Sequence, residues 1–544
     1  MKYSWMKHDG KTFGIQEIED GELVLTTSFV KNVFAGDLGD YGGDWATRTS
    51  VRWKDEHADR LKGERTSVFF YFYNEGPERF DFEDDGHTLV GSNAYLGKFR
   101  ARISTNATEE SPLSFTGIPV DGIEKLTQNL TTVLIAPEFK WNRAYDNAQA
   151  YVVHVHATVP FDINVVYESL SPGEGEYDLS HRHQQLHGAN YDALLAQRVQ
   201  AFDDRFEQTF GLMQRGFTAA QVRFAQAALS NMVGSVGYWY GSSLVRDVEE
   251  DARRHKAAQE AAKSGSRRPP TPAPAIYKSF DAPLFSGVPS RSFFPRGFMW
   301  DEGFHQLLIN RWDPDLTREV LAHWLDLMNV HGWIPREQIR DSEARSKVPD
   351  EFVVQPSDNA NPPTWFLVLE DILDRVDAAP DADSETVQRD LAFVQGAYPR
   401  LVAWFKWFDT QRGAAPTTYR WRGRQRKKGM MNALTLTSGL DDYPRASHPD
   451  ETERHLDLRC WMAEAAAVLS RVAERIGHPT HEFQVRSTHL EFTLVYVCMF
   501  VCVCLSAYVC LCMFVCMFPA LEVEWHLANP STVAESRIHV MHLL

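Results

Sequence analysis

The spacing of apolar residues changes once along this chain, near residue 188, and the change divides the fold into two parts. Before it, apolar and polar residues alternate, most clearly over Tyr151–Val159, which is the period of a strand with one buried face. Similar short runs occur at Leu23–Val30, Ser67–Tyr73 and Thr131–Ile135, between turns rich in Gly, Asp and Asn. Many short strands with this spacing predict an N-terminal β-sandwich over residues 1–170.

Beyond residue 188 the apolar residues recur at helical intervals. We expect a linker with a helix at 171–215 and a helical domain at 216–483, interrupted at 249–276 by a charged, Pro-rich insertion without ordered structure. Paired helices without strand alternation predict a toroid or a solenoid. The expected helices are Tyr191–Leu212, Thr218–Val233, Thr317–Val330, Pro363–Val376, Glu385–Ala397, Arg400–Thr410 and Leu456–Ile476.

Composition narrows the class of partner. The chain has 73 acidic and 56 basic residues, and its net charge of −17 argues against a nucleic-acid partner. Of its seven cysteines only Cys460 precedes residue 498, so the globular part has no disulfide framework. A half-exposed strand face and a polar loop explain two histidine groups better than a metal site does. These groups are His154 with His156, and His181 with His183 and His187.

The last residues, 484–544, differ from the rest of the chain in complexity. Phe492–Phe518 holds 27 residues without a charge, which is long enough for a membrane span. However, Val497–Phe500 recurs as Val515–Phe518, and alternating Val and Cys is what a translated TG repeat produces. We therefore interpret this segment as an aberrant low-complexity tail, from a retained intron or a misdrawn gene end, rather than as a membrane anchor.

Four short islands combine Trp, Arg, Asp and Glu with Gly or Pro. Such density of polar groups among rigid aromatic residues suits the hydroxyls and apolar faces of a sugar. The alternative is ordinary helix starts, with Asp301 as a cap and with Glu453 and Asp457 complementing a helix dipole. The islands are Phe293–His305, Gly332–Gln338, Asp358–Pro363 and Ser438–Trp461.

Within the last island, Asp441 and Asp442 are adjacent. Two carboxylates in one confined site do not both ionise easily, so one of them is held protonated, as a general acid requires. A turn with two solvated acids explains the pair equally simply.

In sequence and in order, these islands resemble the motifs of the eukaryotic processing α-glucosidases of glycoside hydrolase family 63. Lys7–Lys31 and Gly42–Trp45 are similar to the N-terminal domain of that family, and the resemblance covers about residues 3–483. It implies a β-sandwich followed by an (α/α)6 toroid, which this chain would contain only in part. The matching segments are Phe293–His305, Trp333–Gln338, Asn359–Thr364, Ser438–Arg445 and Glu453–Trp461.

The resemblance implies an inverting hydrolase without cofactor or metal. Its partner would be the triglucosylated N-glycan of nascent glycoproteins, from which it removes the terminal α-1,2-linked glucose in the endoplasmic reticulum. Ser438–Asp441 matches the segment that carries the acid in related toroidal trehalases, so we expect Asp441 to be the general acid. The expected substrate contacts are Phe294, Arg296, Gly297, Trp300, Asp301, Glu302, His305, Trp333, Arg336, Glu337, Asn361, Asp442, Tyr443, Arg445, Glu453 and Asp457.

Two features of the family have no match in this sequence. One is the N-terminal anchor that attaches the family to the membrane, and the other is the glutamate base near the C-terminus. We therefore expect this exact chain to be inactive and poorly folded. The sequons at Asn106 and Asn129 fit a lumenal domain with N-linked glycans.

Two other functions stay open at this point. One is a trehalase-like or other toroidal α-glucosidase. The other is a carbohydrate-binding protein without catalysis, which keeps the sugar-holding wall and lacks the base.

Overall fold

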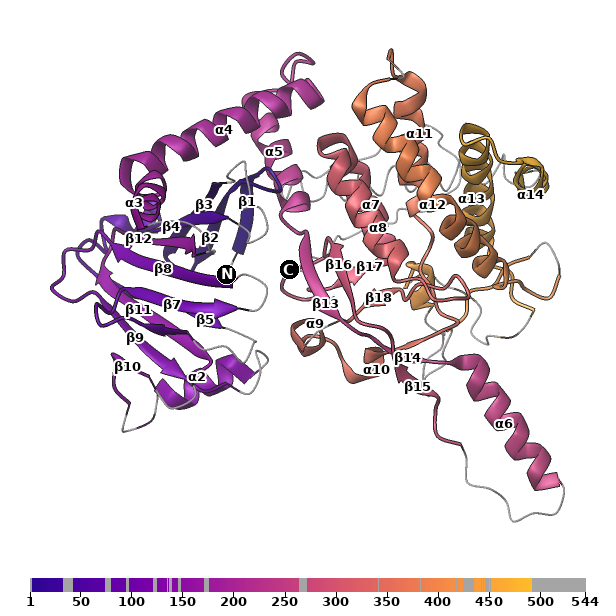
Figure 1. The fold of residues 1–544 in the computed structure, drawn as a ribbon, viewed down its shortest axis with the longest axis horizontal. Helices are drawn as coiled ribbons and strands as arrows, with labels where there is room; N and C mark the ends of the chain where they lie inside the picture. Colours follow the sequence, from indigo (N-terminus) through magenta and orange to yellow (C-terminus); the bar gives the residue numbers. More distant parts are fainter. Residues whose placement is uncertain are drawn as a thin grey trace, which may run out of the picture. The chain divides into compact units, whose positions relative to one another are not determined.

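Two β-sheets form the N-terminal part of the computed structural model (Figure 1). The structure describes residues 2–32, 43–73, 80–93, 97–120, 125–134, 136, 139–144, 148–170, 176–263, 272–340, 342–381, 383–415, 418–423, 435–441, 443, 445, 450 and 452–491. The eight-stranded sheet contains, in spatial order, β1 (Lys2–His8), β2 (Phe13–Asp20), β3 (Leu23–Asn32), β4 (Asp44–Trp53), β12 (Phe161–Ser169), β8 (Gly97–Thr105), β7 (Thr88–Asn93) and β6 (Phe80–Phe82). The four-stranded sheet contains β10 (Arg143–Ala144), β9 (Leu113–Ile118), β11 (Ala150–Thr158) and β5 (Arg65–Tyr73).

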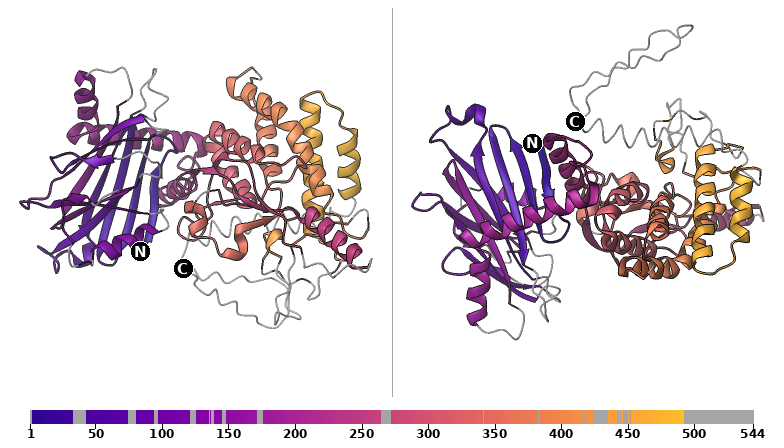
Figure 2. Two further views of the ribbon diagram at one scale, coloured as in Figure 1. Left: turned by 60° about the horizontal axis from the view of Figure 1, so that its bottom comes forward. Right: turned by 90° about the horizontal axis from the view of Figure 1, so that it is seen from above.

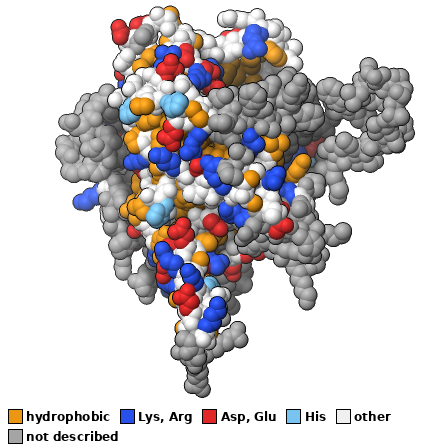
Figure 3. All heavy atoms as spheres, turned by 90° about the vertical axis from the view of Figure 1, so that its right-hand side faces the viewer, with side chains coloured by type: hydrophobic (Ala, Val, Ile, Leu, Met, Phe, Trp, Pro, Cys, Tyr) orange, Lys and Arg blue, Asp and Glu red, His pale blue; other side chains and the backbone are white. Residues whose placement is uncertain are grey.

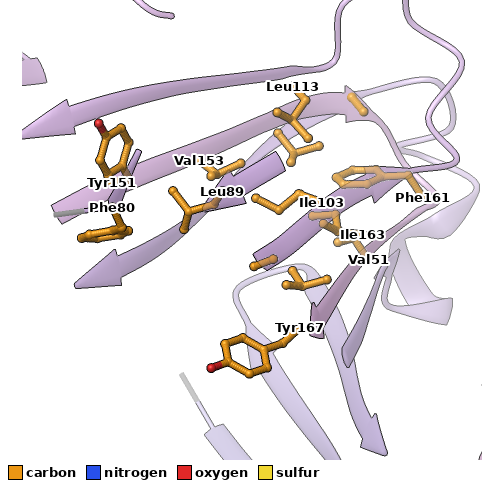
Figure 4. Close-up of a cluster of buried hydrophobic side chains, with 14 of the residues drawn as sticks. Val51, Phe80, Leu89, Ile103, Leu113, Tyr151, Val153, Phe161, Ile163 and Tyr167 are labelled. Atoms are coloured by element: carbon orange, nitrogen blue, oxygen red, sulfur yellow. The ribbon is translucent and has the colours of Figure 1, made fainter. Parts of the chain in front are cut away.

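One apolar core lies between the two sheets (Figure 4). Val51, Ile103 and Ile163 come from the larger sheet, and Tyr151 and Val153 come from the smaller one. The predicted strand at 151–159 is thereby confirmed, because its alternate residues all join this core. An N-terminal domain rich in β-structure is also confirmed.

The predicted strand at Thr131–Ile135 is wrong. Residues 131–134 end the helix α2 (Leu126–Leu134), and Ile135 lies outside the described residues. Leu126, Leu130 and Val133 recur in the sequence at helical intervals, and Val133 packs against a small cluster that includes Val152. The β-branched residues at 131–133 suggested a strand. The apolar residues of the whole segment 126–134 recur at helical spacing, and the segment forms a helix.

The polar loop expected around His181, His183 and His187 is also wrong. His181 and His183 belong to α3 (Glu176–Gln185), and His187 precedes α4 (Gly188–Phe210). Arg182 anchors α3 to the sheet, because its Nε donates to the buried carboxylate of Asp44 at 2.7 Å. Among the described residues, no group of three or more His, Cys, Asp or Glu could hold a metal ion.

Helices α4 and α5 (Ala219–Val233) agree with the prediction. Helix α4 crosses strands of the eight-stranded sheet (Figures 1 and 2), where the Tyr191 hydroxyl contacts Ser28 Oγ at 2.8 Å. Helix α5 begins with a capping box formed by Thr218 and Gln221. Its side chains also bind β1, where Asn231 Oδ1 accepts from the Trp5 amide at 3.0 Å.

Beyond residue 290, six longer helices build the described chain. The predictions for α11 and α13 are confirmed, whereas α8 begins and ends earlier than expected and α14 was not expected at all. The helices are α7 (Met299–Trp312), α8 (Pro314–Asp326), α11 (Trp365–Ala378), α12 (Glu385–Asp409), α13 (Leu456–Arg475) and α14 (His481–Glu491).

Helix α12 corrects the prediction of two helices at 385–397 and 400–410. It runs through Pro399 as one helix of 25 residues. Val394 and Ala397 before the proline, and Leu401 and Trp404 after it, are all buried. Burial of one apolar stripe on both sides of Pro399 outweighs the hydrogen bond that the proline removes.

The boundary of the tail at residue 484 is wrong as well. Residues 484–491 belong to α14, where Phe483 contacts the Phe405 ring and Arg486 pairs with Asp409 at 2.8 Å. Residues 1–492 form one compact unit of the chain. The remainder of the low-complexity segment, from residue 492 on, lies outside the described residues.

The insertion at 249–276, which we expected to be disordered, contains the helix α6 (Val248–Lys263). The base of this helix is tied down, because Asp251 accepts from the Ala275 amide at 2.6 Å. Glu250 also pairs with Arg253 and Arg254 at helical spacing. Acidic and basic side chains both occur along this helix, and Figure 3 shows both kinds intermingled on the face that it presents.

Short strands and helices connect these elements. No helix in the described part of the chain has both the length and the apolar character that crossing a bilayer requires. The strands are β13 (Gly237–Gly241), β14 (Leu244–Arg246), β15 (Ile276–Lys278), β16 (Ala282–Ser286), β17 (Gly297–Phe298), β18 (Glu337–Gln338) and β19 (Val354–Pro356), and the helices are α1 (Asp55–Ala58), α9 (Ser342–Ser346) and α10 (Asp350–Val353).

The substitution Arg182→Met tests the anchor of α3. It leaves the Asp44 carboxylate buried without its cation, so we expect the free energy of unfolding to fall by about 3–5 kcal/mol. Urea unfolding followed by far-UV circular dichroism measures the change. Arg60→Met, which removes an exposed pair with Glu22, is the matched control and should cost less than about 1 kcal/mol. Equal losses in the two variants would contradict the assignment.

Candidate active site

A short antiparallel pairing joins the first two islands of the sequence. Gly297 in β17 lies opposite Gln338 in β18, and the Met299 amide then donates to the Arg336 carbonyl at 2.9 Å. Gly297 also leaves room for a third segment, because a Cβ there would lie 2.7 Å from Ser286 Oγ in β16. Segments 40 residues apart are thus held side by side at the start of α7.

A buried ion pair locks this junction. Arg296 Nε and Nη2 donate to Glu337 Oε2 at 3.0 and 2.9 Å, and both side chains are almost completely buried. The guanidinium also lies over the rings of Phe294 and Phe298. Arg336 supplies a second cation to Glu337 at 2.5 Å. Because a buried charge without a partner is costly, these residues determine each other's positions.

Hydrogen bonds bring the third island to the first two. Trp333 Nε1 donates to the Asn359 carbonyl at 2.7 Å. Thr364 Oγ1, in the turn before α11, donates to the Trp300 carbonyl at 2.7 Å. The predicted residues Trp300, Trp333 and Asn361 therefore lie on neighbouring segments, although as many as 61 positions separate them in the sequence.

The loop that carries Asp441 completes the assembly. It starts from the 3-10 helix η3 (Leu436–Ser438), whose carbonyls at Leu436 and Thr437 accept from Arg336 Nη1 at 3.5 Å and Asn361 Nδ2 at 3.3 Å. Gly439 has φ +72°, and a Cβ there would meet the Trp300 indole at 2.6 Å. The indole thus packs on the backbone of the loop.

Asp441 follows this contact and is exposed, as are Leu440 and Tyr443 on either side of it. Asp442, the other half of the predicted carboxyl pair, lies outside the described residues. The structure therefore places Asp441, Trp300 and Arg336 around one loop.

The first turn of α7 carries three titratable groups. Glu302 is fully buried and accepts from Ser286 Oγ at 3.0 Å and Gln306 Nε2 at 2.6 Å, and the first of these bonds ties the turn to β16. Burial raises the pKa of Asp301 to about 6, against the opposing charges of His305 and Arg336. Burial disfavours protonation of His305, but its hydrogen bond to Glu302 and the charges of Glu302 and Asp301 raise its pKa overall.

The alternative in which Asp301 caps this helix is wrong. The N-cap position is Phe298, and Asp301 lies within the first turn.

The end of the fourth island forms a second cluster of charged and aromatic groups. Asp457 accepts from Arg445 Nη2 and from Trp421 Nε1, each at 2.8 Å. Glu453 is close to His455, at 3.8 Å, and His455 Nδ1 accepts from the Trp421 amide at 2.9 Å. Asp457 therefore orients Arg445, whose guanidinium lies over the Tyr443 ring at 5.5 Å.

Two residues of this site were missed by the sequence analysis. Trp421 holds both Asp457 and His455, and it lies in Tyr419–Gly423, a segment with the same mixture of aromatic, Arg and Gly residues as the islands. Burial raises the pKa of Asp358, although the charges of Arg422 and Arg246 oppose this. Asp358 belongs to the third island but was not singled out within it.

The assembled site is aromatic, partly buried and carries protonatable carboxyls. This combination can stack an apolar ring face, orient hydroxyl groups and transfer a proton.

Comparisons with protein families agree with a site that acts on sugars. The family model described as Glycosyl hydrolase family 63 C-terminal domain matches residues 186–496, and the corresponding N-terminal domain model matches residues 1–142.

Three relatives match over most of this chain. Mannosyl-oligosaccharide glucosidase GCS1 from Arabidopsis thaliana is 37% identical over 488 residues, which are 87% of this chain and 54% of that protein. Alpha-glucosidase 2 from the same plant is 36% identical and covers 87% and 59% of the two chains. The probable mannosyl-oligosaccharide glucosidase of Schizosaccharomyces pombe is 30% identical, with 87% and 65% covered. The chain thus spans between about half and two thirds of these relatives' lengths.

Solved structures are more distant. A GH63 mannosylglycerate hydrolase from Thermus thermophilus, in complex with Tris and D-glycerate, is 14% identical with a TM-score of 0.29, covering 44% of this chain and 64% of that one. The GH92 α-mannosidase BT3965 from Bacteroides thetaiotaomicron is 10% identical with a TM-score of 0.26, covering 87% and 49%. Scores this low carry no argument about the fold.

Gly439→Ala tests the contact between the loop and the Trp300 indole. Gly477 has the same φ of +72°, but a Cβ added there would have no atom within 4 Å, so Gly477→Ala measures the backbone strain alone. We expect Gly439→Ala to lower the free energy of unfolding by about 1–3 kcal/mol more than the control, because the indole must move. Thermal and urea unfolding measure both variants. Equal losses would show that the indole does not pack on this loop.

Asp301→Asn tests the raised pKa of Asp301. The folded protein holds this proton up to about pH 6, whereas the unfolded chain releases it near its ordinary value of 3.8. Protonation therefore stabilises the folded state at low pH, and this contribution is lost as the pH rises from about 4 to about 6. We expect the stability of the parent protein relative to Asp301→Asn to fall by about 2–3 kcal/mol over this range. Urea unfolding at pH 4 and pH 7 measures it, and a constant difference would contradict it.

Proposed function

Because this chain belongs to glycosyl hydrolase family 63, we propose that the protein is an inverting α-glucosidase of N-glycan processing. Its substrate would be the triglucosylated N-glycan of newly made glycoproteins, from which it releases the terminal α-1,2-linked glucose. The observation that carries this proposal is the convergence of the sequence islands on the loop of Asp441. The names of the relatives, mannosyl-oligosaccharide glucosidases, support the same substrate class.

In this proposal Asp441 is the general acid that protonates the leaving oxygen. Inversion also needs a carboxylate on the opposite side of the sugar to activate water, and we assign that base to no described residue. The exposed position of Asp441 leaves it accessible to substrate. Asp457 and Trp421 would keep Arg445 beside Tyr443, so that this pair contacts the sugar or orients the acid together with Asp442.

The other residues predicted to contact the substrate fall into two groups, those with buried side chains and those with more accessible ones. We propose that the buried side chains of Arg296, Glu302 and Glu337 position the wall of the pocket rather than touch the sugar. Gly297, Trp333 and Asn361 are also buried and would support the same wall. The more accessible side chains of Phe294, Trp300, Asp301, His305 and Arg336 would meet the glucose ring. The Glu453 side chain, which is only 8% exposed beside His455, would support them.

We further propose that the helices belong to an (α/α)6 toroid and that the protein works in the lumen of the endoplasmic reticulum, attached to its membrane. Both proposals follow from the family. Asn106 supports a lumenal location, because it lies exposed in the loop after β8, where glycans are usually attached. Asn129 is the weaker acceptor, since it is half-buried within a helix, α2.

The function is tested by glucose release from a triglucosylated glycan by the full-length protein. We expect Asp441→Asn to lower kcat by about 100-fold or more, because a general acid contributes on that order. Asp450→Asn, a change of another exposed aspartate in the same region, is the control and should leave kcat unchanged.

The first anomer released, observed by proton NMR, should be β-glucose. Retention of configuration, or release of glucose from trehalose alone, would contradict the proposal. The same assay on residues 1–544 tests the expectation that this chain by itself is inactive.

A further inference from the structure

A group of aromatic and polar side chains lies on the outer face of the four-stranded sheet, far in sequence from the proposed active site. In β5, Val68, Phe70 and Phe72 point into the core, so the intervening residues point outward. Phe69 and Tyr71 are accordingly 42% and 55% exposed. In β11, His154 and His156 also point outward, and they lie directly opposite Phe69 and Ser67.

Three rings form a compact stack on this face. Phe69 and His154 are nearly parallel, with their centroids 4.7 Å apart. Trp141 stacks on His154 at 4.8 Å and lies 6.5 Å from Phe69. Phe139 meets the edge of Trp141 at 4.9 Å, which fixes the orientation of the indole. The four rings thus contact one another and support each other's positions on this face.

Backbone geometry brings Trp141 to this position. The next residue, Asn142, has φ 58° and is the one described residue other than glycine with φ in the left-handed region. Two hydrogen bonds hold it against Phe115 of β9, at 2.7 Å through its amide and 3.1 Å through its side chain. After glycine, Asn is one of the residue types that adopt this conformation most readily, and the two hydrogen bonds hold it there.

Uncharged hydrogen-bonding groups border the rings. Ser67 Oγ lies 2.9 Å from His154 Nε2 and 3.1 Å from His156 Nδ1. Burial and the neighbouring His156 lower the pKa of His154, so this imidazole is neutral near pH 7. The surface thus combines fixed apolar rings with neutral donors and acceptors.

We propose that this surface binds a neutral oligosaccharide at a site separate from the proposed active site. The face of a pyranose is apolar and its rim carries hydroxyl groups, which matches rings bordered by a hydroxyl and two imidazoles. A charged ligand would find no opposite charge among these side chains. We call this site the outer-sheet surface, and it consists of Ser67, Phe69, Tyr71, Trp141, His154 and His156.

This inference goes beyond the proposed function, because the outer-sheet surface draws only on residues 67–156, whereas the proposed active site draws on residues 294–457. Binding there needs no turnover.

The test measures binding of a fluorescently labelled oligomannose glycan that carries no glucose. It uses the full-length protein with Asp441→Asn, so that no substrate is consumed. We expect Phe69→Ala and Tyr71→Ala each to weaken binding by about tenfold, which corresponds to the loss of one stacking contact. Phe217→Ala is the matched control, because Phe217 is also 42% exposed but lies between α4 and α5. It should leave the affinity unchanged.

Tyr71→Ala keeps the test decisive if Phe69→Ala disturbs the stack, and Trp141→Phe, which retains an aromatic ring, should keep most of the affinity. Unchanged binding in Tyr71→Ala and Phe69→Ala, or no measurable binding by the parent, overturns the proposal. The proposal is also overturned if the surface binds an apolar peptide and no glycan, a result that would favour a protein partner. If the protein with Asp441 intact releases no glucose but the protein binds glycan through Phe69, only the proposed function fails.

Discussion

The buried ion pair of Arg296 and Glu337 is the constraint on which the rest of the proposed active site depends. Two opposite charges with almost no exposure must remain together, because separation would leave each of them desolvated without compensation. The pair therefore fixes β17 against β18, and with them the start of α7. Arg336, next in sequence to Glu337, reaches from this junction to the carbonyl of Leu436.

Contacts extend from this fixed junction to the polar groups that must be accessible to a substrate. Trp300 packs on the backbone of Gly439, which leads directly to the exposed Asp441. Asp301 is held beside His305 and Glu302 in a partly desolvated turn, which accounts for its raised pKa. Buried side chains thus provide rigidity, and their immediate neighbours in sequence provide accessible polar groups. This division is the usual basis of a preorganised site.

In the β-sandwich, too, a buried set of side chains fixes the structure, but here the buried groups are apolar rather than charged. Its inner face is apolar and shared by both sheets, so the register of β5 and β11 is determined by burial. The outer face is free of that requirement, yet it carries a rigid stack of Phe69, His154 and Trp141. The described chain thus carries both of the surfaces that we propose to bind sugar, one in each half.

Local periodicity explains what could be predicted without a structure. The strand at 151–159 and the helix α13 have strong alternation or a continuous apolar stripe, and both agree with the structure. Where two local signals compete, the prediction was wrong. The β-branched residues at 131–135 suggested a strand within a helical period, and Pro399 suggested a break that buried neighbours on both sides override. The helix α6 was not predicted, because its mostly polar residues give no periodic apolar stripe.

The sequence by itself determined the division into β-rich and helical parts and the family, because motifs and periodicity are properties of neighbouring residues. Only the tertiary structure decided which members of those motifs are accessible. Glu302 and Asp301 are adjacent in sequence. The Glu302 carboxylate is buried and accepts hydrogen bonds from Ser286 and Gln306, whereas Asp301 is partly exposed and has a raised pKa. Likewise Trp421 joins the site, and Trp141 joins His154, only through folding. Burial and the pairing of distant charges depend on long-range contacts, which no local pattern contains.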